Sequence, residues 1–129
     1  MAKILLLEPD RIFANNYRRA LVLGGHEVIW HNDAQAAINS VDKDVPDIII
    51  VEPQIRGNNG IEFLYELRSY TDWKEIPVVI LSLVPDYALS LSPRILEQLK
   101  IVDYLYKPQT SLEKLSNSID NLLLLTIGK

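Results

Sequence analysis

The chain has 129 residues, of which 48 % are hydrophobic and 23 % charged, as expected for one ordinary globular domain over residues 1–129. Its lack of cysteine excludes disulfides and a thiol nucleophile, and 17 acidic against 13 basic residues, without a basic cluster, argue against direct nucleic-acid binding. No apolar run approaches the length of a membrane span and no export signal precedes Lys3, so we expect a cytoplasmic protein that does not bind a membrane.

Five short apolar runs are predicted to form β-strands. They cover residues 3–7, 27–30, 47–51, 77–81 and 101–105. Ile, Val and Leu fill these runs almost continuously, which is typical of strands buried on both faces of a parallel sheet.

Segments with helical spacing of apolar residues separate these strands and follow the last one. The first ends at Gly24, and the second is short, with Asp33 as its expected N-cap. A third helix is expected over residues 61–67.

The last two helical segments carry specific expectations. Residues 84–99 contain Pro85 and Pro93, so we expect this helix to be split into two pieces. Thr110 and Glu113 have the spacing of a capping box at the start of the final helix.

Strands and helices thus alternate five times, which predicts an α/β fold with a parallel sheet covered on both faces.

Polar residues follow four of the predicted strands. Glu8 ends the first strand, Glu52 the third, Ser82 the fourth and Lys107 the fifth. Because ligands of open α/β sheets bind beyond the carboxyl ends of the strands, we expect these four side chains to meet at one edge.

Four stretches, in order, resemble the receiver domain of two-component response regulators: KILLLEPD, PDIIIVEPQIRGNNGIEFLYELR, IPVVILS and VDYLYKP. The resemblance covers nearly the whole chain. It implies a flavodoxin-like (βα)5 doubly wound sheet with strand order 2-1-3-4-5. In the family, the lysine that corresponds to Lys107 is followed by a peptide bond that is typically cis, here the bond to Pro108.

The resemblance also implies roles for single residues. In the family an Asp after the third strand accepts a phosphoryl group, acids after the first strand hold magnesium, and a hydroxyl and a lysine contact the phosphoryl oxygens. By position, Glu52 stands for the acceptor and Glu8 for the first acid. Ser82 stands for the hydroxyl, Lys107 for the lysine and Tyr104 for the aromatic that responds to phosphorylation.

The sequence departs from the family pattern at the positions that, by the resemblance, carry phosphorylation and metal binding. Glu52 is one methylene longer than Asp, and Pro9 replaces the second acid with a side chain that has no oxygen, so we expect no tight magnesium site. Asp10 is interpreted as the N-cap of the first helix rather than a substitute ligand. Leu83 is bulky and is expected to cover the entrance, while Arg56 is expected to offer a charge partner near the acids.

Three interpretations of Glu52 and Lys107 remain open at this stage. They form an ion pair that fills a vestigial pocket, they mimic the phosphorylated state permanently, or Glu52 accepts phosphate. The leading prediction is a pseudo-receiver, a non-enzymatic interaction module in signal transduction that needs no cofactor. The alternative is a phosphoaccepting response regulator that receives phosphate from a histidine kinase and requires magnesium.

A third class, a small α/β enzyme using Glu8, Glu52 and Lys107 as acid and base, ranks last. The sequence offers it neither a Gly-rich phosphate loop nor a nucleophile with a base. By resemblance, the expected partners are proteins, such as a histidine kinase or an output domain, or a second copy in a homodimer. The expected contact face consists of the fourth helix, the fifth strand with Tyr104, and the fifth helix.

Overall fold

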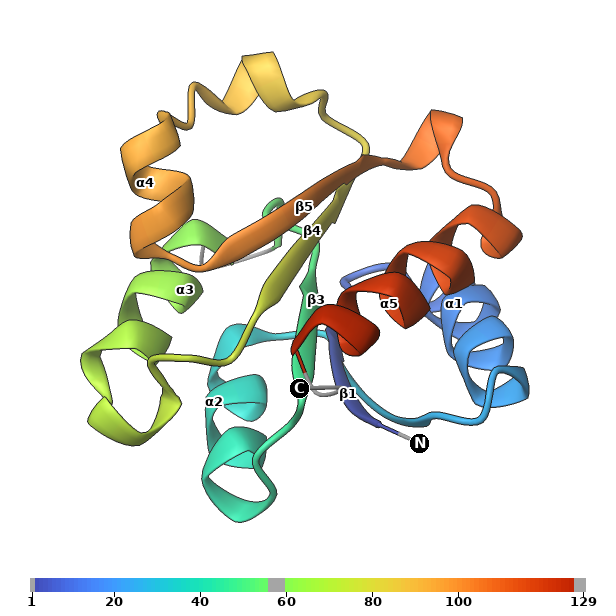
Figure 1. Ribbon diagram of the computed structural model, residues 1–129, viewed down its shortest axis with the longest axis horizontal. Helices are drawn as coiled ribbons and strands as arrows, with labels where there is room; N and C mark the ends of the chain where they lie inside the picture. The colour runs from blue at the N-terminus through green and yellow to red at the C-terminus, as the bar shows by residue number, and fades with distance from the viewer. Residues whose placement is uncertain (1, 56–59, 127–129) are drawn as a thin grey trace.

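The computed structural model describes residues 2–55 and 60–126, in which five strands form one parallel sheet (Figure 1). The strands are β1 (Lys3–Leu7), β2 (Glu27–His31), β3 (Ile48–Val51), β4 (Val78–Ser82) and β5 (Ile101–Tyr106). Their spatial order is β2-β1-β3-β4-β5, which confirms the predicted topology. Each predicted strand end lies within one residue of the observed end.

Helices cover both faces of this sheet (Figure 1). One face carries α1 (Arg11–Leu23) and α5 (Leu112–Thr126), and the other carries α2 (Ala34–Lys43), α3 (Gly60–Ser69) and α4 (Pro93–Gln98). Alternate strand residues serve the two cores: Leu5 and Leu7 pack toward the α2 and α3 side, whereas Ile4 and Leu6 pack toward α1 and α5. This period of two is what a sheet buried on both faces requires.

The first two helices begin at the N-caps that the sequence predicts. Asp10 Oδ1 accepts hydrogen bonds from the amides of Ile12 and Phe13 at 2.8 and 3.0 Å. Asp33 Oδ1 accepts one from the amide of Ala36 at 2.8 Å. Both carboxylates thereby satisfy amides that the first turn of a helix leaves without partners.

The predicted capping box of the last helix is wrong by one residue. Ser111, not Thr110, caps α5 through a 3.0 Å hydrogen bond from the amide of Lys114. Thr110 instead donates its hydroxyl to the carbonyl of Tyr106 at 2.7 Å. This bond holds Thr110 against the end of β5, so the helix begins one residue later.

The segment between β4 and β5 is split as its prolines predict. A 3₁₀ turn, η2 (Asp86–Leu89), precedes the short helix α4, which begins at Pro93. The peptide bond between Lys107 and Pro108 is trans, so the cis bond implied by the family resemblance is wrong for this chain.

The strand β5 forms one edge of the sheet. Its Tyr104 amide donates to Oδ1 of the neighbouring Asp103 at 2.8 Å, and its Tyr106 carbonyl accepts the Thr110 hydroxyl.

Within residues 2–55 and 60–126, no helix is long and apolar enough to cross a membrane.

Candidate functional site

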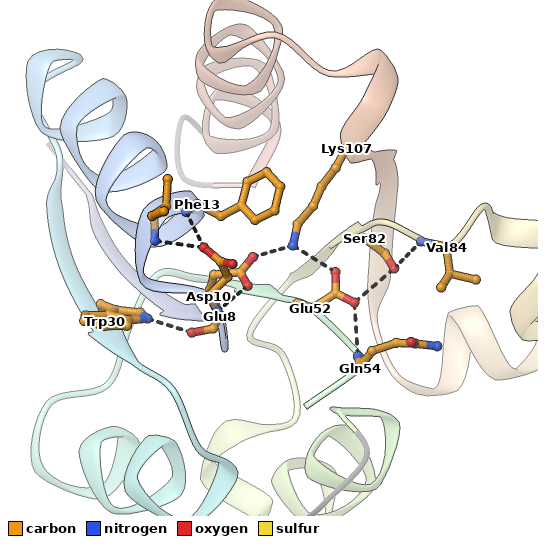
Figure 2. A network of polar contacts seen from close by, with 10 residues as sticks. Glu8, Asp10, Phe13, Trp30, Glu52, Gln54, Ser82, Val84 and Lys107 are labelled. Carbon is orange, nitrogen blue, oxygen red and sulfur yellow. Dashed lines mark hydrogen bonds and ion pairs between the residues drawn. The ribbon is translucent and has the colours of Figure 1, made fainter. Parts of the chain in front are cut away.

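The carboxyl edge of the sheet gathers the four predicted polar side chains (Figure 2). Glu8 follows β1, Glu52 follows β3, Ser82 ends β4 and Lys107 follows β5. Their exposed fractions are 1 %, 4 %, 0 % and 8 %, so a cluster of charged groups is buried beneath the surface. Charged groups are rarely buried to this extent unless they are paired.

Lys107 is the centre of this cluster. Its Nζ lies 2.6 Å from Glu8 Oε1 and 3.2 Å from Glu52 Oε2. The Phe13 ring on α1 covers the ammonium, with 4.4 Å between Nζ and the ring centroid. One cation therefore serves two carboxylates and an aromatic face, an arrangement that compensates part of its desolvation.

The two carboxylate oxygens of Glu8 and Glu52 that do not face Lys107 both accept hydrogen bonds from nearby donors (Figure 2). Glu8 Oε2 accepts the amide of Asp10 at 3.0 Å. Glu52 Oε1 accepts the amide of Gln54 at 3.1 Å and the hydroxyl of Ser82 at 3.2 Å. Glu52 Oε2 is buried and receives no hydrogen bond from the described residues, so its only polar contact there is the ion pair with Lys107.

Burial raises the pKa of Glu8, because a carboxylate loses solvation when it leaves water. The hydrogen bond and charge of Lys107 and the amide of Asp10 act in the opposite direction, and the charge of Glu52 adds to the rise. The loss of solvation outweighs the contacts that lower the pKa, so the net shift of the Glu8 pKa is upward. The short ion pair between Glu8 and Lys107 therefore stabilises the fold by less than its length suggests.

Two contacts of this cluster carry no signal in the sequence. The indole of Trp30, on β2, donates to the backbone carbonyl of Glu8 at 2.8 Å. The Phe13 ring reaches Lys107 across 94 positions of the chain. Both residues otherwise look like ordinary core aromatics, and only the folded arrangement of α1, β1 and β2 brings them to the site.

A chain of hydrogen bonds leads from Glu52 to β5. The hydroxyl of Ser82 donates to Glu52 and accepts the amide of Val84 at 3.0 Å. The carbonyl of Val84 in turn accepts the hydroxyl of Tyr104. Tyr104, predicted to be the responsive aromatic, is thus connected to the acidic cluster through three successive bonds.

Tyr104 also faces a hollow of about 380 Å³ on the β5 side of the molecule. The hollow is further lined by residues of η2, the end of β5, the turn that follows β5 and the start of α5, including Asp86, Tyr87, Gln109 and Lys114. Burial raises the pKa of Tyr104, because it disfavours the charged phenolate relative to the hydroxyl that donates to Val84.

The residues expected to modify access lie around the mouth of the cluster. A hollow of about 210 Å³ is lined by Pro9, Phe13 and Leu83 together with the acidic residues and Lys107. Leu83 is 53 % exposed at this rim, and its role as an access gate stays a prediction. Asp10 is turned toward the amides of α1. Arg56 lies outside the residues that the structure describes.

The family resemblance implies magnesium, and the residues of this site do not fit that ion. Magnesium requires near-octahedral oxygen ligation. Glu8 and Glu52 are directed at Lys107, Asp10 caps a helix, and Pro9 has no side-chain donor. Among the described residues, no three His, Asp or Glu side chains are grouped so that they could hold a metal.

The sheet order and the helices on both faces define an α/β protein of the flavodoxin-like class. Residues 4–120 match the response regulator receiver domain family. The chain therefore belongs to this family of signalling domains.

Similar proteins agree with this assignment. The response regulator MprA of Mycobacterium leprae is 31 % identical over 80 residues, which cover 62 % of this chain and 34 % of MprA. The response regulator protein FleR of Pseudomonas aeruginosa is 29 % identical over 109 residues, which cover 83 % of this chain and 22 % of FleR. The chain thus matches about a third or less of the length of these relatives.

Solved structures share the fold at low sequence identity. The chemotaxis protein CheY4 of Vibrio cholerae superimposes with a TM-score of 0.84 at 22 % identity, covering 95 % of this chain and 99 % of CheY4. A putative response regulator of Chloroflexus aurantiacus gives a TM-score of 0.81 at 22 % identity, covering 95 % and 97 % of the two chains.

Proposed function

We propose that this receiver-family domain is a pseudo-receiver, a protein-interaction module of signal transduction that is not phosphorylated through the usual Asp and magnesium site. The observation that carries the proposal is the buried Lys107 ammonium shared by Glu8 at 2.6 Å and Glu52 at 3.2 Å. Glu52 thereby makes the lysine and hydroxyl contacts that, by the family resemblance, a phosphoryl group makes. Two features support the loss of magnesium-dependent phosphotransfer: Pro9 has no side-chain oxygen, and the described residues contain no group of three His, Asp or Glu side chains placed to hold a metal ion.

The hydrogen-bond chain supports a fixed conformation for this module. Glu52, Ser82, Val84 and Tyr104 are connected without any added group. A single carboxylate has less charge and fewer oxygens than a phosphoryl group. In this proposal, Glu52 therefore mimics a phosphoryl group in how it holds Ser82 and Tyr104, and not in its charge.

The partner in this proposal is a protein that contacts α4, β5 and α5. The hollow beside Tyr104 supports this choice, because it combines tyrosine rings with Asp86 and Lys114 on a surface continuous with the hydrogen-bond chain. Aromatic side chains with polar tips are enriched at protein interfaces. A cytoplasmic location and a signalling role without catalysis are further parts of this proposal.

An NMR titration with magnesium and beryllofluoride, a phosphoryl mimic, tests the proposal. The backbone amides of Glu52 and Lys107 and the indole N–H of Trp30 report directly on the cluster. We expect no saturable shift in the natural chain. Saturable shifts at these groups would instead establish the phosphoaccepting alternative.

Variants at two positions provide the matched controls. Glu52→Asp alone shortens the acid but leaves Pro9 in place, so it should remain unresponsive to magnesium and to a small phosphodonor. Adding Pro9→Asp restores the second acid, and the double variant should gain a magnesium-dependent response. A fully active Glu52→Asp single variant would show that Pro9 is not what disables the site.

A second pair of variants tests the fixed position of Tyr104. Glu52→Ala removes the acceptor of the Ser82 hydroxyl, whereas Glu52→Gln keeps an acceptor oxygen. We expect the Tyr104 ring resonances and the Val84 amide to shift in Glu52→Ala and to stay close to their natural positions in Glu52→Gln. Identical spectra at Tyr104 in both variants would contradict the proposed coupling.

A further inference from the structure

The strand β2 forms the edge of the sheet opposite β5, because β1 is its only neighbouring strand. Its first and last residues bond toward β1. The Glu27 amide donates to the carbonyl of Ala2 at 2.9 Å, and the His31 carbonyl accepts the amide of Glu8 at 3.0 Å. The odd-numbered residues of β2 therefore use their backbone groups within the sheet.

The two residues between these positions, Val28 and Trp30, present their backbone groups to the outside. In a parallel strand the N–H and C=O of one residue point to the same side, and successive residues alternate in side. Both groups of Val28 and of Trp30 therefore point away from β1. Within residues 2–55 and 60–126, none of these four groups forms a hydrogen bond.

The composition of β2 does not protect this edge. Natural sheets usually protect an exposed edge with Lys, Pro or a bulge. The strand reads Glu-Val-Ile-Trp-His, without Lys or Pro, and its pairing with β1 continues in one register along its length. Residues 28–31 are each partly exposed. An unprotected edge made of Val, Ile and Trp is better explained by a chain that covers it.

The strand is complementary to a second copy of itself. In an antiparallel pairing centred on Ile29, Val28 lies opposite Trp30 of the second copy, and these two residues exchange both of their backbone hydrogen bonds. A two-fold axis through the centre repeats the pair, so all outward groups of both strands are satisfied. The two Ile29 residues then form the closer, non-hydrogen-bonded pair, with Cα atoms about 4.5 Å apart.

The side chains at the strand ends agree with this register. Glu27 lies opposite His31 of the second copy on the same face of the joined sheet, and the two-fold axis repeats the contact. An imidazole N–H can donate to a carboxylate. Shifting the pairing by two residues would place Glu27 opposite Ile29 and lose both contacts.

Both end residues have free side chains for this contact. Neither Glu27 nor His31 forms a side-chain hydrogen bond or ion pair with the part of the chain that the structure describes. Lys3 lies beside Glu27 on β1, but its ammonium is already paired with Asp44 at 2.7 Å. Glu27 is therefore available to a second chain.

We propose that the β2 edge binds a second copy of this chain and joins two five-stranded sheets into one continuous sheet across a two-fold axis. An extended peptide of another protein has the same backbone groups, but it does not account for the match of Glu27 with His31. This surface differs from the face of α4, β5 and α5. The proposal does not depend on whether Glu52 accepts phosphate.

The size of the edge sets the expected strength of the dimer. Five residues of β2 extend about 17 Å, so the contact is small for a specific interface. The helices α1 and α2, which both contact β2, add area beside the strands. We expect a reversible dimer with a dissociation constant on the order of 0.1 mM.

Hydrogen exchange measured residue by residue tests the register directly. In a monomer the Val28 and Trp30 amides face solvent, whereas the Ile29 amide is bonded within the sheet. Raising the chain concentration from about 20 µM to about 1 mM should slow exchange at Val28 and Trp30 by about threefold or more, with little change at Ile29. Sedimentation velocity should show conversion of monomer to dimer over the same concentrations.

Charge variants at the strand ends provide a matched test. Glu27→Arg removes the carboxylate opposite His31 and should weaken the dimer by at least about fivefold. Adding His31→Glu exchanges the two roles and should restore most of the affinity. Glu113→Arg, the same charge change at an exposed position of α5, should leave dimerisation unchanged. Because Glu27 is exposed, thermal unfolding of Glu27→Arg should match that of the natural chain and verify its fold.

Three results would overturn the proposal. The first is a chain that stays monomeric up to about 1 mM, with fast exchange at Val28 and Trp30 throughout. The second is a dimer in which these two amides exchange as fast as in the monomer, which would place the contact elsewhere. The third is a dimer weakened by Glu113→Arg and not by Glu27→Arg, which would place it on the α5 side.

Discussion

Replacing Lys107 by methionine tests whether its ammonium is what permits two carboxylates to be buried. Glu8 and Glu52 are 1 % and 4 % exposed, and Lys107 is their shared counter-charge. Removing one partner from a buried ion pair costs about 3–5 kcal/mol, because the remaining charge stays desolvated. Since domains of this kind are stable by about 5–15 kcal/mol, the melting temperature of Lys107→Met should fall by roughly 10–20 °C.

The matched control removes all three charges together. Adding Glu8→Gln and Glu52→Gln to Lys107→Met leaves no buried ion, so most of the lost stability should return. Urea unfolding at pH 7, followed by far-ultraviolet circular dichroism, measures the free energies and the m-values of all variants. At pH 5 the deficit of Lys107→Met should shrink, because carboxyl groups without a counter-charge protonate more readily.

Two outcomes would refute this reasoning. One is a loss below about 1 kcal/mol in Lys107→Met, a value expected of an exposed ion pair rather than a buried one. The other is a triple variant as unstable as the single variant, which would show that packing of the lysine stem, and not charge, determines the cost.

Further predictions concern single contacts. The pKa of Glu8 is raised in the folded chain, so above pH 4.5, its ordinary value, the folded chain binds more protons than the unfolded chain. The free energy of unfolding should therefore fall as the pH rises through the raised pKa. In Glu8→Gln, the urea midpoint should therefore depend less on pH between pH 4 and 8 than it does in the natural chain. An unchanged pH dependence would show that another group causes it. Gly60→Ala places a Cβ 2.6 Å from the Cα of Pro53 and should cost about 1–3 kcal/mol in thermal unfolding, whereas an unchanged melting temperature would show that the backbone yields. Tyr104→Phe leaves the carbonyl of Val84 without its donor and should cost about 1 kcal/mol with faster hydrogen exchange nearby. Unchanged stability and exchange would show that this bond contributes nothing to the fold.

The strands could be predicted because their signal is local and strong, whereas their order was implied by the resemblance to the receiver family. Runs of Ile, Val and Leu bounded by polar residues leave little choice for a parallel sheet. The positions of Glu8, Glu52, Ser82 and Lys107 followed from the same runs, because each residue ends or follows a strand whose carboxyl end lies at one edge.

Contacts between distant segments could not be predicted in the same way. Thr110 and Glu113 had the spacing of a cap, but the hydroxyl of Thr110 found a closer acceptor at the end of β5. The trans bond before Pro108 departs from the family pattern without any sign in the neighbouring residues. Trp30 and Phe13 reach the site only through packing of the helices and strands that carry them.

The edge strand β5 limits how another chain can attach to this domain. A free strand edge is a template for adding a further strand, and so for both peptide capture and aggregation. Here the Tyr104 amide is occupied by Asp103 and the Tyr106 carbonyl by Thr110. A chain approaching this edge finds those two backbone groups already bonded, so adding a strand along the full length of β5 would first require both bonds to break.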